Sequence, residues 1–469
     1  MKTTNESHAI QLIAGNSNRA RSLKGSILIA AIVAAIFLVF IACGNSRTGD
    51  MSSPGNTGNK GTAASVFYSV VFDSNGGTPV ESQSIKKGKK AVMPEDPTMA
   101  IETEGLYPGT PEITLEGWYN GETKWDFNAP VTADITLKAN WDIPVPLELP
   151  AGNIVDKAIA YIDNKAGVYT LFLGNDYSVA AKTLNNNSKL VIIGAGQERT
   201  ISLSANGTLL TIRNNFELTL GKNITLRGKS GNDNALVVLS DRASKLNMLE
   251  GSKITGNSGK PDNDKSAKIG GAGVEVKNGV FTMKGGEITG NTNNWRAFED
   301  FAYAAASGVF ISRFGTLVMK GGRIAGNSGG VANVVYMAGN MIDADKTANG
   351  PDLVLSGDAT IESIALTSQN YTVEKSIGIE CDNWNPSDKV TLHLSASGWF
   401  GHAIDSAETR DIFLGAISNG NKDIYILKAV SGDLSDALDK LTLGNFFNDH
   451  WGNTAISPYK ILSSGKLGK

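Results

Sequence analysis

The chain has 469 residues, enough for two or three domains of ordinary size. Its 43 basic and 46 acidic residues give a formal net charge of −3, which does not indicate a polyanionic partner, so we expect no nucleic-acid binding. Glycine is unusually frequent, with 53 residues, which indicates many tight turns. Two cysteines, Cys43 and Cys381, cannot build a disulfide framework.

Residues 1–42 are organised like a secretory signal, with a basic flank followed by an apolar run at 26–42. Small and polar residues follow that run directly. The four residues FIAC, which end at Cys43, resemble the lipobox of bacterial lipoproteins, although Phe40 stands where that family usually has leucine. The resemblance implies cleavage before Cys43 and its lipidation, and hence a membrane partner. A plain transmembrane anchor is the alternative.

Residues 43–65 are rich in Gly, Ser, Asn and Thr without apolar periodicity, which predicts a flexible tether. A random coil of this length reaches on the order of 25 Å. If Cys43 is lipidated, Cys381 is the one remaining thiol. Its neighbours, GIECDNW, predict a strand in which the thiol is a small buried hydrophobe.

Residues 66–142 are predicted to form a small β domain. Alternating Tyr68, Val70 and Phe72 indicate a strand, and the following Asn-Gly-Gly at 75–77 indicates a turn. Two more strands are expected within 115–141. Trp118, Trp125, Phe127 and Trp141 are expected to form the core of this domain, with a ligand platform as the alternative.

The same residues resemble the Listeria–Bacteroides repeat, the B-repeat of internalins and of many bacterial surface proteins. The shared positions are Val71-Phe-Asp-x-Asn-Gly-Gly77, Gly88, Pro94-x-x-Pro97, Gly117-Trp118-Tyr119, Trp125-Asp-Phe127, Val131-Thr132 and Leu137-Lys-Ala-Asn-Trp141. The resemblance implies a compact β-grasp-like module that acts as a spacer or ligand-binding unit, without catalysis. The segment 98–114 is longer than the family's.

Residues 143–152 are a proline-spaced linker, and the segment 153–167 has a helical apolar face with Asn153 as its N-cap. Three near-identical stretches follow further on: MLEGSKITGN at 248–257, MKGGEITGN at 283–291 and MKGGRIAGN at 319–327. Aligned on one another, these repeats give three short strands per unit, each with inward alternation. Since no single unit can bury its apolar face alone, the repetition predicts a right-handed parallel β-helix.

We therefore expect a mainly β chain in which the β-helix spans 153–430 between helical caps. One cap is the helix at its start, and the other is the C-terminal cap at 431–469, in which residues 432–447 are expected to form a short helix. Asn257, Asn291 and Asn327 follow a glycine at one corner of each unit. They are expected to take the left-handed conformation that a sharp corner needs and to stack as a hydrogen-bonded ladder. The segment 270–291 resembles pectate-lyase-like β-helix repeats and, more loosely, repeats of polymorphic outer-membrane proteins.

No motif for polysaccharide cleavage stands on the repeats, such as Asp-Asp, Asn-Thr-Asp or Arg-Ile-Lys. Insertions at 258–273 and 292–308 leave the same corner of consecutive units and are expected to be neighbours. Aromatic and acidic side chains there could bind sugar rings or a protein, although packing of the rings against the flank is the alternative. These candidate ligand-binding residues are Trp295, Phe298, Phe301, Tyr303, Asp262 and Asp264.

The sequence thus predicts a lipid-anchored protein of the cell envelope, in the outer membrane or on the cell surface. We expect a non-enzymatic binding or adhesion module for carbohydrate or protein ligands, the latter a host protein or a cell-surface protein. A polysaccharide lyase or glycoside hydrolase on the β-helix, or a passive stalk, are the alternatives. We expect no cofactor and no metal site. Calcium at Asp262 and Asp264 is the one ion considered, but the spacing of these residues falls short of a full ligand set.

Overall fold

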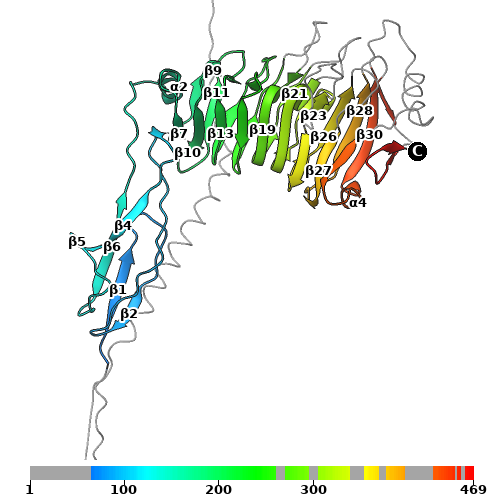
Figure 1. The fold of residues 1–469 in the computed structure, drawn as a ribbon. Helices are drawn as coiled ribbons and strands as arrows, with labels where there is room; N and C mark the ends of the chain where they lie inside the picture. Colours follow the sequence, from blue (N-terminus) through cyan, green and yellow to red (C-terminus); the bar gives the residue numbers. More distant parts are fainter. Residues whose placement is uncertain are drawn as a thin grey trace, which may run out of the picture. The chain divides into compact units, whose positions relative to one another are not determined.

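The structure is a computed structural model, and it describes residues 65–259, 270–294, 305–337, 353–368, 376–396, 426–448, 452–455 and 460–468. Cys43 and the predicted signal segment lie outside these ranges. The described part is mainly β, as predicted: a small sheet domain precedes a β-helix whose strands pair in parallel (Figure 1). No helix in the described ranges is long and apolar enough to cross a membrane.

The small domain is one sheet with the strand order β2-β1-β6-β4-β5. The outer pairs are antiparallel, whereas β1 runs parallel to β6. Asn75 and Gly76 adopt φ of 49° and 97° after β1, which confirms the predicted turn. The strands are β1 (Phe67–Asp73), β2 (Gln83–Lys86), β4 (Thr114–Asn120), β5 (Thr123–Lys124) and β6 (Ile135–Asp142).

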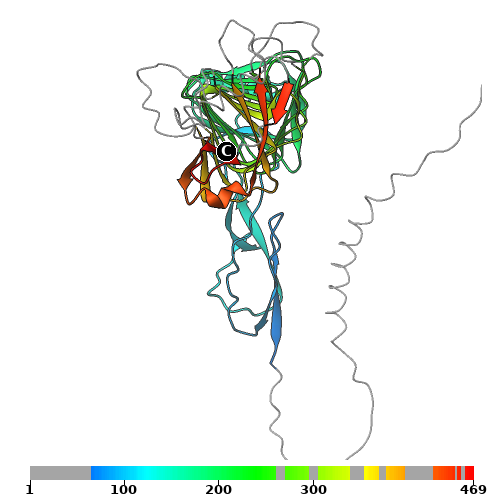
Figure 2. The same ribbon diagram turned by 90° about the vertical axis from the view of Figure 1, so that its right-hand side faces the viewer.

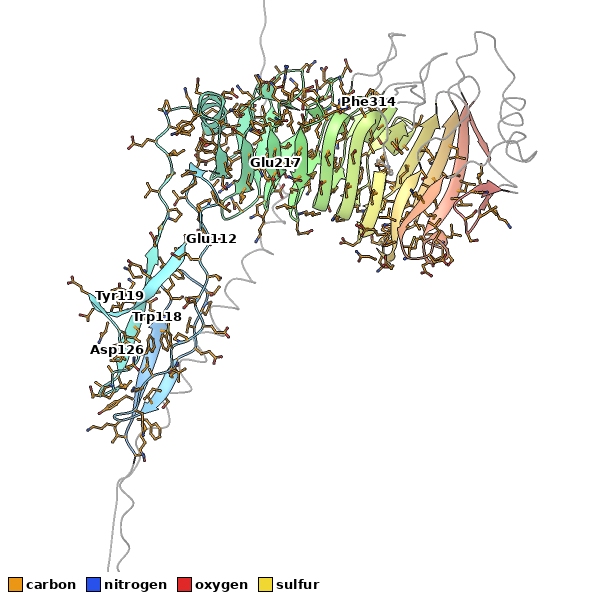
Figure 3. The ribbon with its side chains drawn as sticks, in the orientation of Figure 1. Glu112, Trp118, Tyr119, Asp126, Glu217 and Phe314 are labelled. Carbon is orange, nitrogen blue, oxygen red and sulfur yellow. The ribbon has the colours of Figure 1, made fainter. Side chains whose placement is uncertain are left out.

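Aromatic side chains form the core of this domain, as predicted. Trp118 is fully buried in it and meets Phe72 edge-to-face, with 4.9 Å between ring centroids (Figure 3). Phe72 also stacks on Phe127 at 6.4 Å, and Trp141 lies in the same cluster with Trp125 packed against it. Because these rings pack against one another in a single hydrophobic cluster, they are core residues of the domain.

The long segment 98–114 has a use that the sequence did not reveal. Its strand β3 (Gly105–Pro108) pairs antiparallel with β7 (Val168–Leu173), the first strand of the β-helix. Glu104 just before β3 accepts hydrogen bonds from the Gly174 nitrogen at 2.7 Å and the Tyr177 hydroxyl at 2.6 Å. The insertion thereby covers a sheet edge that would otherwise present unpaired backbone groups.

Helix α2 (Ile154–Asn164) covers the start of the β-helix core, as predicted. The Asn153 side chain accepts hydrogen bonds from the backbone nitrogens of Val155 and Asp156, which satisfies two of the free donors of the first turn. Val155, Ala158, Ile159 and Ile162 then point into the core.

Three stacks of parallel strands follow, and Figure 2 shows the coils superposed on one another. The first stack consists of β7, β10 (Lys189–Gly194), β13 (Glu217–Leu220), β16 (Lys245–Met248), the middle of β19 (Val274–Thr289), the middle of β21 (Ala305–Ile324), β24 (Leu353–Gly357), β27 (Ile377–Trp384) and β29 (Leu427–Ser431).

The second stack consists of β8 (Tyr177–Val179), β11 (Arg199–Leu203), β14 (Ile224–Arg227), β17 (Ser252–Thr255), the ends of β19 and β21, and β25 (Thr360–Ile361). The third consists of β9 (Lys182–Leu184), β12 (Leu210–Ile212), β15 (Val237–Leu239), the starts of β19 and β21, β23 (Ala332–Met337), β26 (Ser363–Ser368), β28 (Val390–Ala396) and β30 (Leu441–Asn448). Two short parallel pairs join consecutive units at the insertions: β18 (Gly270–Gly271) with β21, and β20 (Thr292–Asn293) with β22 (Ser328–Gly329).

The register confirms the alignment of the repeats. Ile254 pairs with Ile288, which in turn pairs with Ile324, and all three are fully buried. The aligned pairs of the other two strands behave in the same way. Each apolar side chain therefore lies against its equivalents above and below, about 4.8 Å away along the axis. Cys381 is buried in β27, as expected of a small apolar residue, and burial raises the pKa of its thiol.

The far end differs from the predicted C-terminal cap. Of the described residues in this region, only those of α4 (Ser435–Leu438) are helical, whereas β30 continues the third stack by pairing in parallel with β28. Alternation of Leu441 and Leu443 is the reason, since it suits a strand better than a helix. The end is completed by β31 (Gly452–Ala455), antiparallel to β30, and by the hairpin of β32 (Lys460–Ile461) and β33 (Leu467–Gly468).

Candidate functional site

Each of the three repeated stretches crosses one strand of the second stack and bends at both of its ends. We call the bend after the strand the Gly-Asn corner (residues 256–257, 290–291 and 326–327) and the bend before it the Gly-Gly turn (residues 250–251, 285–286 and 321–322). The first copy carries Glu250-Gly251 in place of two glycines. The two bends differ in their chemistry.

The Gly-Asn corner is closed and buried. The Asn291 amide donates to the Asn327 side-chain oxygen at 3.0 Å, and the Asn327 amide donates to that of Asn333 at 2.8 Å. The Asn291 oxygen accepts from the Asn257 backbone nitrogen at 3.2 Å. The predicted ladder is thus confirmed, with one correction: the left-handed residue is the glycine, with φ of 65–72°, and the asparagine only fills the corner.

The Gly-Gly turn leaves no room for side chains on its inner side. Gly286 and Gly322 have φ of 80° and 83°, and a Cβ on Gly322 would lie 2.7 Å from the backbone of the coil below. A Cβ on Gly285 would lie 2.7 Å from the backbone nitrogen of Glu250. Stacked glycines therefore let successive coils approach closely here, and they add no side chains to the outer surface.

A groove of about 690 Å³ runs over these turns, and we call it the turn groove. Its lining comes from seven successive coils, which at about 4.8 Å per coil span roughly 30 Å. Only one apolar side chain larger than alanine, that of Pro386, contributes. The lining residues are Glu198, Asn223, Thr225, Glu250, Gly251, Ser252, Lys253, Gly286, Glu287, Gly322, Arg323, Asp358, Thr360, Asn385, Pro386 and Ser387.

A column of charges of alternating sign lines the groove. Lys253, Glu287 and Arg323 occupy equivalent positions of neighbouring strands, because each pairs with the next in the register. Lys253 lies 3.8 Å from Glu287, and the Arg323 guanidinium donates to Asp388 at 3.2 Å. Both cations of the groove are therefore already matched by a carboxylate of the protein itself.

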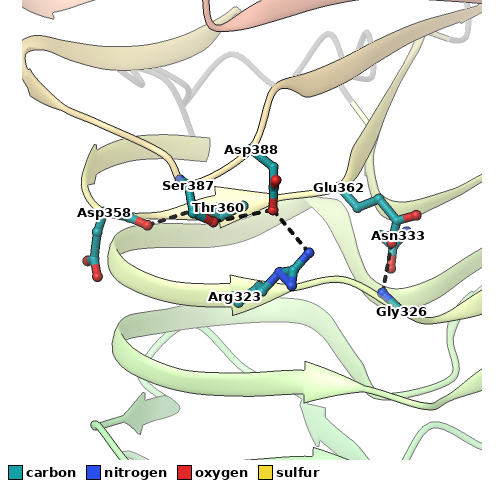
Figure 4. Close-up of polar contacts among 8 residues, drawn as sticks. All are labelled: Arg323, Gly326, Asn333, Asp358, Thr360, Glu362, Ser387 and Asp388. Carbon is teal, nitrogen blue, oxygen red and sulfur yellow. Dashed lines mark hydrogen bonds and ion pairs between the residues drawn. The ribbon is translucent and has the colours of Figure 1, made fainter.

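Two carboxylates in the groove remain unmatched. Within the described ranges, the side chains of Glu250 and Asp358 make no hydrogen bond and no ion pair, and both are exposed. Figure 4 shows Asp358 engaged through its backbone oxygen alone, which accepts from the Thr360 hydroxyl at 3.1 Å. The two residues are three coils apart, or about 14 Å along the axis, but their carboxylates lean over the glycine turns between them. A Cβ on Gly285 would lie 2.8 Å from a carboxylate oxygen of Glu250, and a Cβ on Gly321 would lie 2.5 Å from one of Asp358. The groove thus offers two free carboxylates over the glycine turns of neighbouring coils.

A smaller cavity of about 240 Å³ lies at the roots of the two insertions. Glu275 lines it with a side chain only 13% exposed, 3.6 Å from Lys277. Burial raises the pKa of Glu275, and the charge and hydrogen bond of Lys277 partly oppose that rise. Asn232 forms another wall of the cavity, and its side-chain amide donates a hydrogen bond to the side-chain oxygen of Asn257 in the ladder.

The predicted binding residues Trp295, Phe298, Phe301, Tyr303, Asp262 and Asp264 all lie outside the described residues, so their role remains a prediction. The roots of the two insertions are neighbours, as expected. Ser258 bridges Thr292 in parallel, and the Asn294 amide donates to the Gly259 oxygen at 2.6 Å. Among the described side chains, no group of three or more His, Cys, Asp or Glu could hold a metal ion.

One comparison with known proteins bears on the small domain. Residues 68–140 match the family model of the Listeria-Bacteroides repeat domain. This match confirms the resemblance of the small domain and covers about a sixth of the chain. No curated protein and no solved structure matches the chain.

The residues of the turn groove escaped the sequence analysis because they come from seven short segments spread over residues 198–387. A signal was nevertheless present. Between the second glycine or its equivalent and the constant isoleucine, the three copies carry Lys253 (preceded by Ser252), Glu287 and Arg323. A position that varies among charged residues inside an otherwise constant repeat faces solvent. Because the repeats stack, such positions together indicate an exposed, charged surface along the β-helix.

Proposed function

We propose that this is a lipid-anchored cell-envelope protein, in the outer membrane or on the cell surface, that binds an extended carbohydrate along the turn groove. The observation that carries the proposal is the groove itself, about 30 Å of polar lining over stacked glycines. Carboxylates, amides and hydroxyls offer acceptors and donors to sugar hydroxyls along its length.

A carbohydrate fits this lining better than a protein does. Protein interfaces are built around apolar and aromatic anchors that fill pockets, and Pro386 is the one large apolar residue here. A groove that extends over seven coils also suits a polymer better than a small molecule. The adhesive role expected from the sequence is kept in this proposal, with the contact surface moved from the insertions to the turn groove.

The anchor and the location rest on the FIAC stretch ending at Cys43. They also rest on the small domain, because its resemblance to the Listeria–Bacteroides repeat implies a module of bacterial surface proteins. The pectate-lyase-like character of the coils belongs to the same proposal. Metabolic labelling with a fatty acid tests the anchor: label is expected on the wild type and absent from Cys43→Ala, which should leave the membrane fraction. Unlabelled wild-type protein would contradict it.

Retention of the purified protein on insoluble polysaccharides tests carbohydrate binding. Glu287→Trp places a bulky ring in the groove and is expected to abolish retention. Lys245→Trp is the matched control, since Lys245 is exposed at the start of β16 and does not line the groove. Equal retention of both variants, at unchanged melting temperature, would contradict binding in the turn groove.

A glycoside hydrolase is the second candidate, and one observation favours it: four carboxylates line one groove, which is the kind of group such enzymes use in pairs. Release of reducing ends in the same assay separates the two. Release that is lost in Glu250→Gln or Asp358→Asn would make the protein an enzyme, whereas retention without release supports a binding module.

A further inference from the structure

The turn groove selects its ligand by charge. Four carboxylates and two basic side chains line it, which leaves a formal charge of −2 at pH 7. Both basic side chains are matched, Lys253 by Glu287 and Arg323 by Asp388. The charges that face an incoming ligand without a partner are therefore the carboxylates of Glu250 and Asp358.

From this geometry we infer that the turn groove takes glycans that carry no anionic groups, prefers those with protonated amino groups, and rejects polyuronates and sulfated glycans. The inference rests on the proposed function and adds the class of ligand. An anionic sugar entering the groove would meet free carboxylates and could recruit Lys253 or Arg323 only by breaking an existing ion pair. A hydroxyl or an ammonium group would instead donate to Glu250 or Asp358.

The spacing of the two free carboxylates adds to the argument. Their backbones stand about 14 Å apart along the axis, but the carboxylate of Glu250 lies over Gly285 and that of Asp358 lies over Gly321, on neighbouring coils. Because these glycines carry no side chain, both carboxylates can lie over the turns and face the groove. Neighbouring sugars of one chain can therefore reach both acceptors at once.

Three oligosaccharides of equal length test the inference by titration calorimetry: one of glucosamine, one of N-acetylglucosamine and one of galacturonate. The expected order of affinity is glucosamine, then N-acetylglucosamine, with galacturonate weakest. Since a hydrogen bond to a charged group is worth enough for about a tenfold change, glucosamine should bind at least tenfold more tightly than galacturonate. Raising the salt concentration should weaken glucosamine binding more than N-acetylglucosamine binding.

The double variant Glu250→Gln with Asp358→Asn keeps the shape of both side chains and removes their charge. It is expected to bring glucosamine affinity down to that of N-acetylglucosamine. The control is Glu122→Gln, an exposed carboxylate in the small domain, which should change nothing. Because both groove residues are exposed and unpaired, the melting temperature should stay constant, which separates binding from folding.

The outcomes separate this inference from the proposed function. Galacturonate binding tightest, or an unchanged preference for glucosamine in the double variant, would overturn the charge selection and leave carbohydrate binding standing. Binding of none of the three oligosaccharides would overturn both. Binding of a lysine-rich peptide of the same charge, with no oligosaccharide bound, would replace the glycan by a basic protein segment.

Discussion

The two bends of one repeated stretch, the Gly-Asn corner and the Gly-Gly turn, are about four residues apart in the chain and opposite in character. At the corner, the polar groups of Asn291 are buried and bonded to the coils above and below. At the turn, and at its equivalent in the next coil, the side chains of Glu250 and Asp358 are exposed and make no hydrogen bond or ion pair within the described residues. The polar groups of the corner are hydrogen-bonded within the fold, whereas those at the turn are free to bond to a ligand. Repetition of a motif therefore does not mean that all of it serves one purpose.

The largest effect is expected from Asn291→Ala, which breaks the ladder. The change removes the acceptor of the Asn257 backbone nitrogen and the side-chain donor to the Ile254 oxygen, and it leaves the Asn327 side-chain oxygen only its bond from the backbone nitrogen of residue 291. Each buried group left unsatisfied costs about 1–3 kcal/mol. We expect a loss of about 3 kcal/mol or more in the free energy of unfolding, measured by urea denaturation. Asn247→Ala is the matched control: Asn247 also bonds across coils, to Glu217 and Thr219, but on the outer face (Glu217 is labelled in Figure 3). Equal losses in both would contradict a special role for the corner.

The next largest effect is expected from Gly322→Ala. It combines positive φ with a Cβ placed 2.7 Å from the backbone of Gly285 and Gly286, and such strain costs about 1–3 kcal/mol before any clash. Gly88→Ala has a similar φ of 78° and open space around the new methyl group. Thermal unfolding should show a clearly smaller loss for Gly88→Ala. A loss of the same size would mean that the close approach of the coils does not matter.

A smaller effect is expected from Arg323→Gln, which removes one ion pair of the turn groove. Arg323 is 49% exposed and Asp388 61% exposed, so the pair contributes about 0–1 kcal/mol. Stability should therefore change little, while the newly freed Asp388 should strengthen glucosamine binding. Weaker glucosamine binding in this variant would indicate that Arg323 contacts the ligand directly.

The smallest change is expected from Glu275→Gln and depends on pH. Because burial raises the pKa of Glu275 in the folded protein, its protonated form is favoured by folding. Its contribution is complete below the ordinary glutamate pKa and is lost as the pH rises through the raised value. The variant should thus melt at a higher temperature than the wild type at pH 7, and the difference should shrink on acidification. A constant difference would show that Glu275 titrates normally.

The sequence predicted most of the β-helix because its signals are periodic. Ile254, Ile288 and Ile324 recur in an almost constant context, and burial by stacking is the one arrangement that uses all three. The role of segment 98–114 could not be predicted, since pairing of β3 with β7 joins residues about 60 positions apart and depends on three-dimensional fit. The helix predicted at the far end was too long, because Leu441 and Leu443 alternate with polar or small residues and form part of strand β30.

The turn groove was beyond the sequence for a different reason. Glu250 and Asp358 are more than 100 residues apart, and Asp358 lies outside the three repeated stretches. Their relation follows from the number of residues in each coil, which varies because insertions lengthen some coils. The binding site was instead predicted at Trp295 to Tyr303, because the aromatic residues there lie close together in the sequence.

Hydrogen exchange with and without a saturating glucosamine oligomer tests most directly whether the turn binds while the corner holds the fold. The peptides to compare cover the turns at 284–287 and 320–323 and the corners at 290–291 and 326–327. The corners should exchange slowly in both states. The turns should exchange faster in the free protein and slow down when the oligomer is bound. Protection that appears elsewhere while both turns stay unchanged would contradict the division between a structural corner and a binding turn.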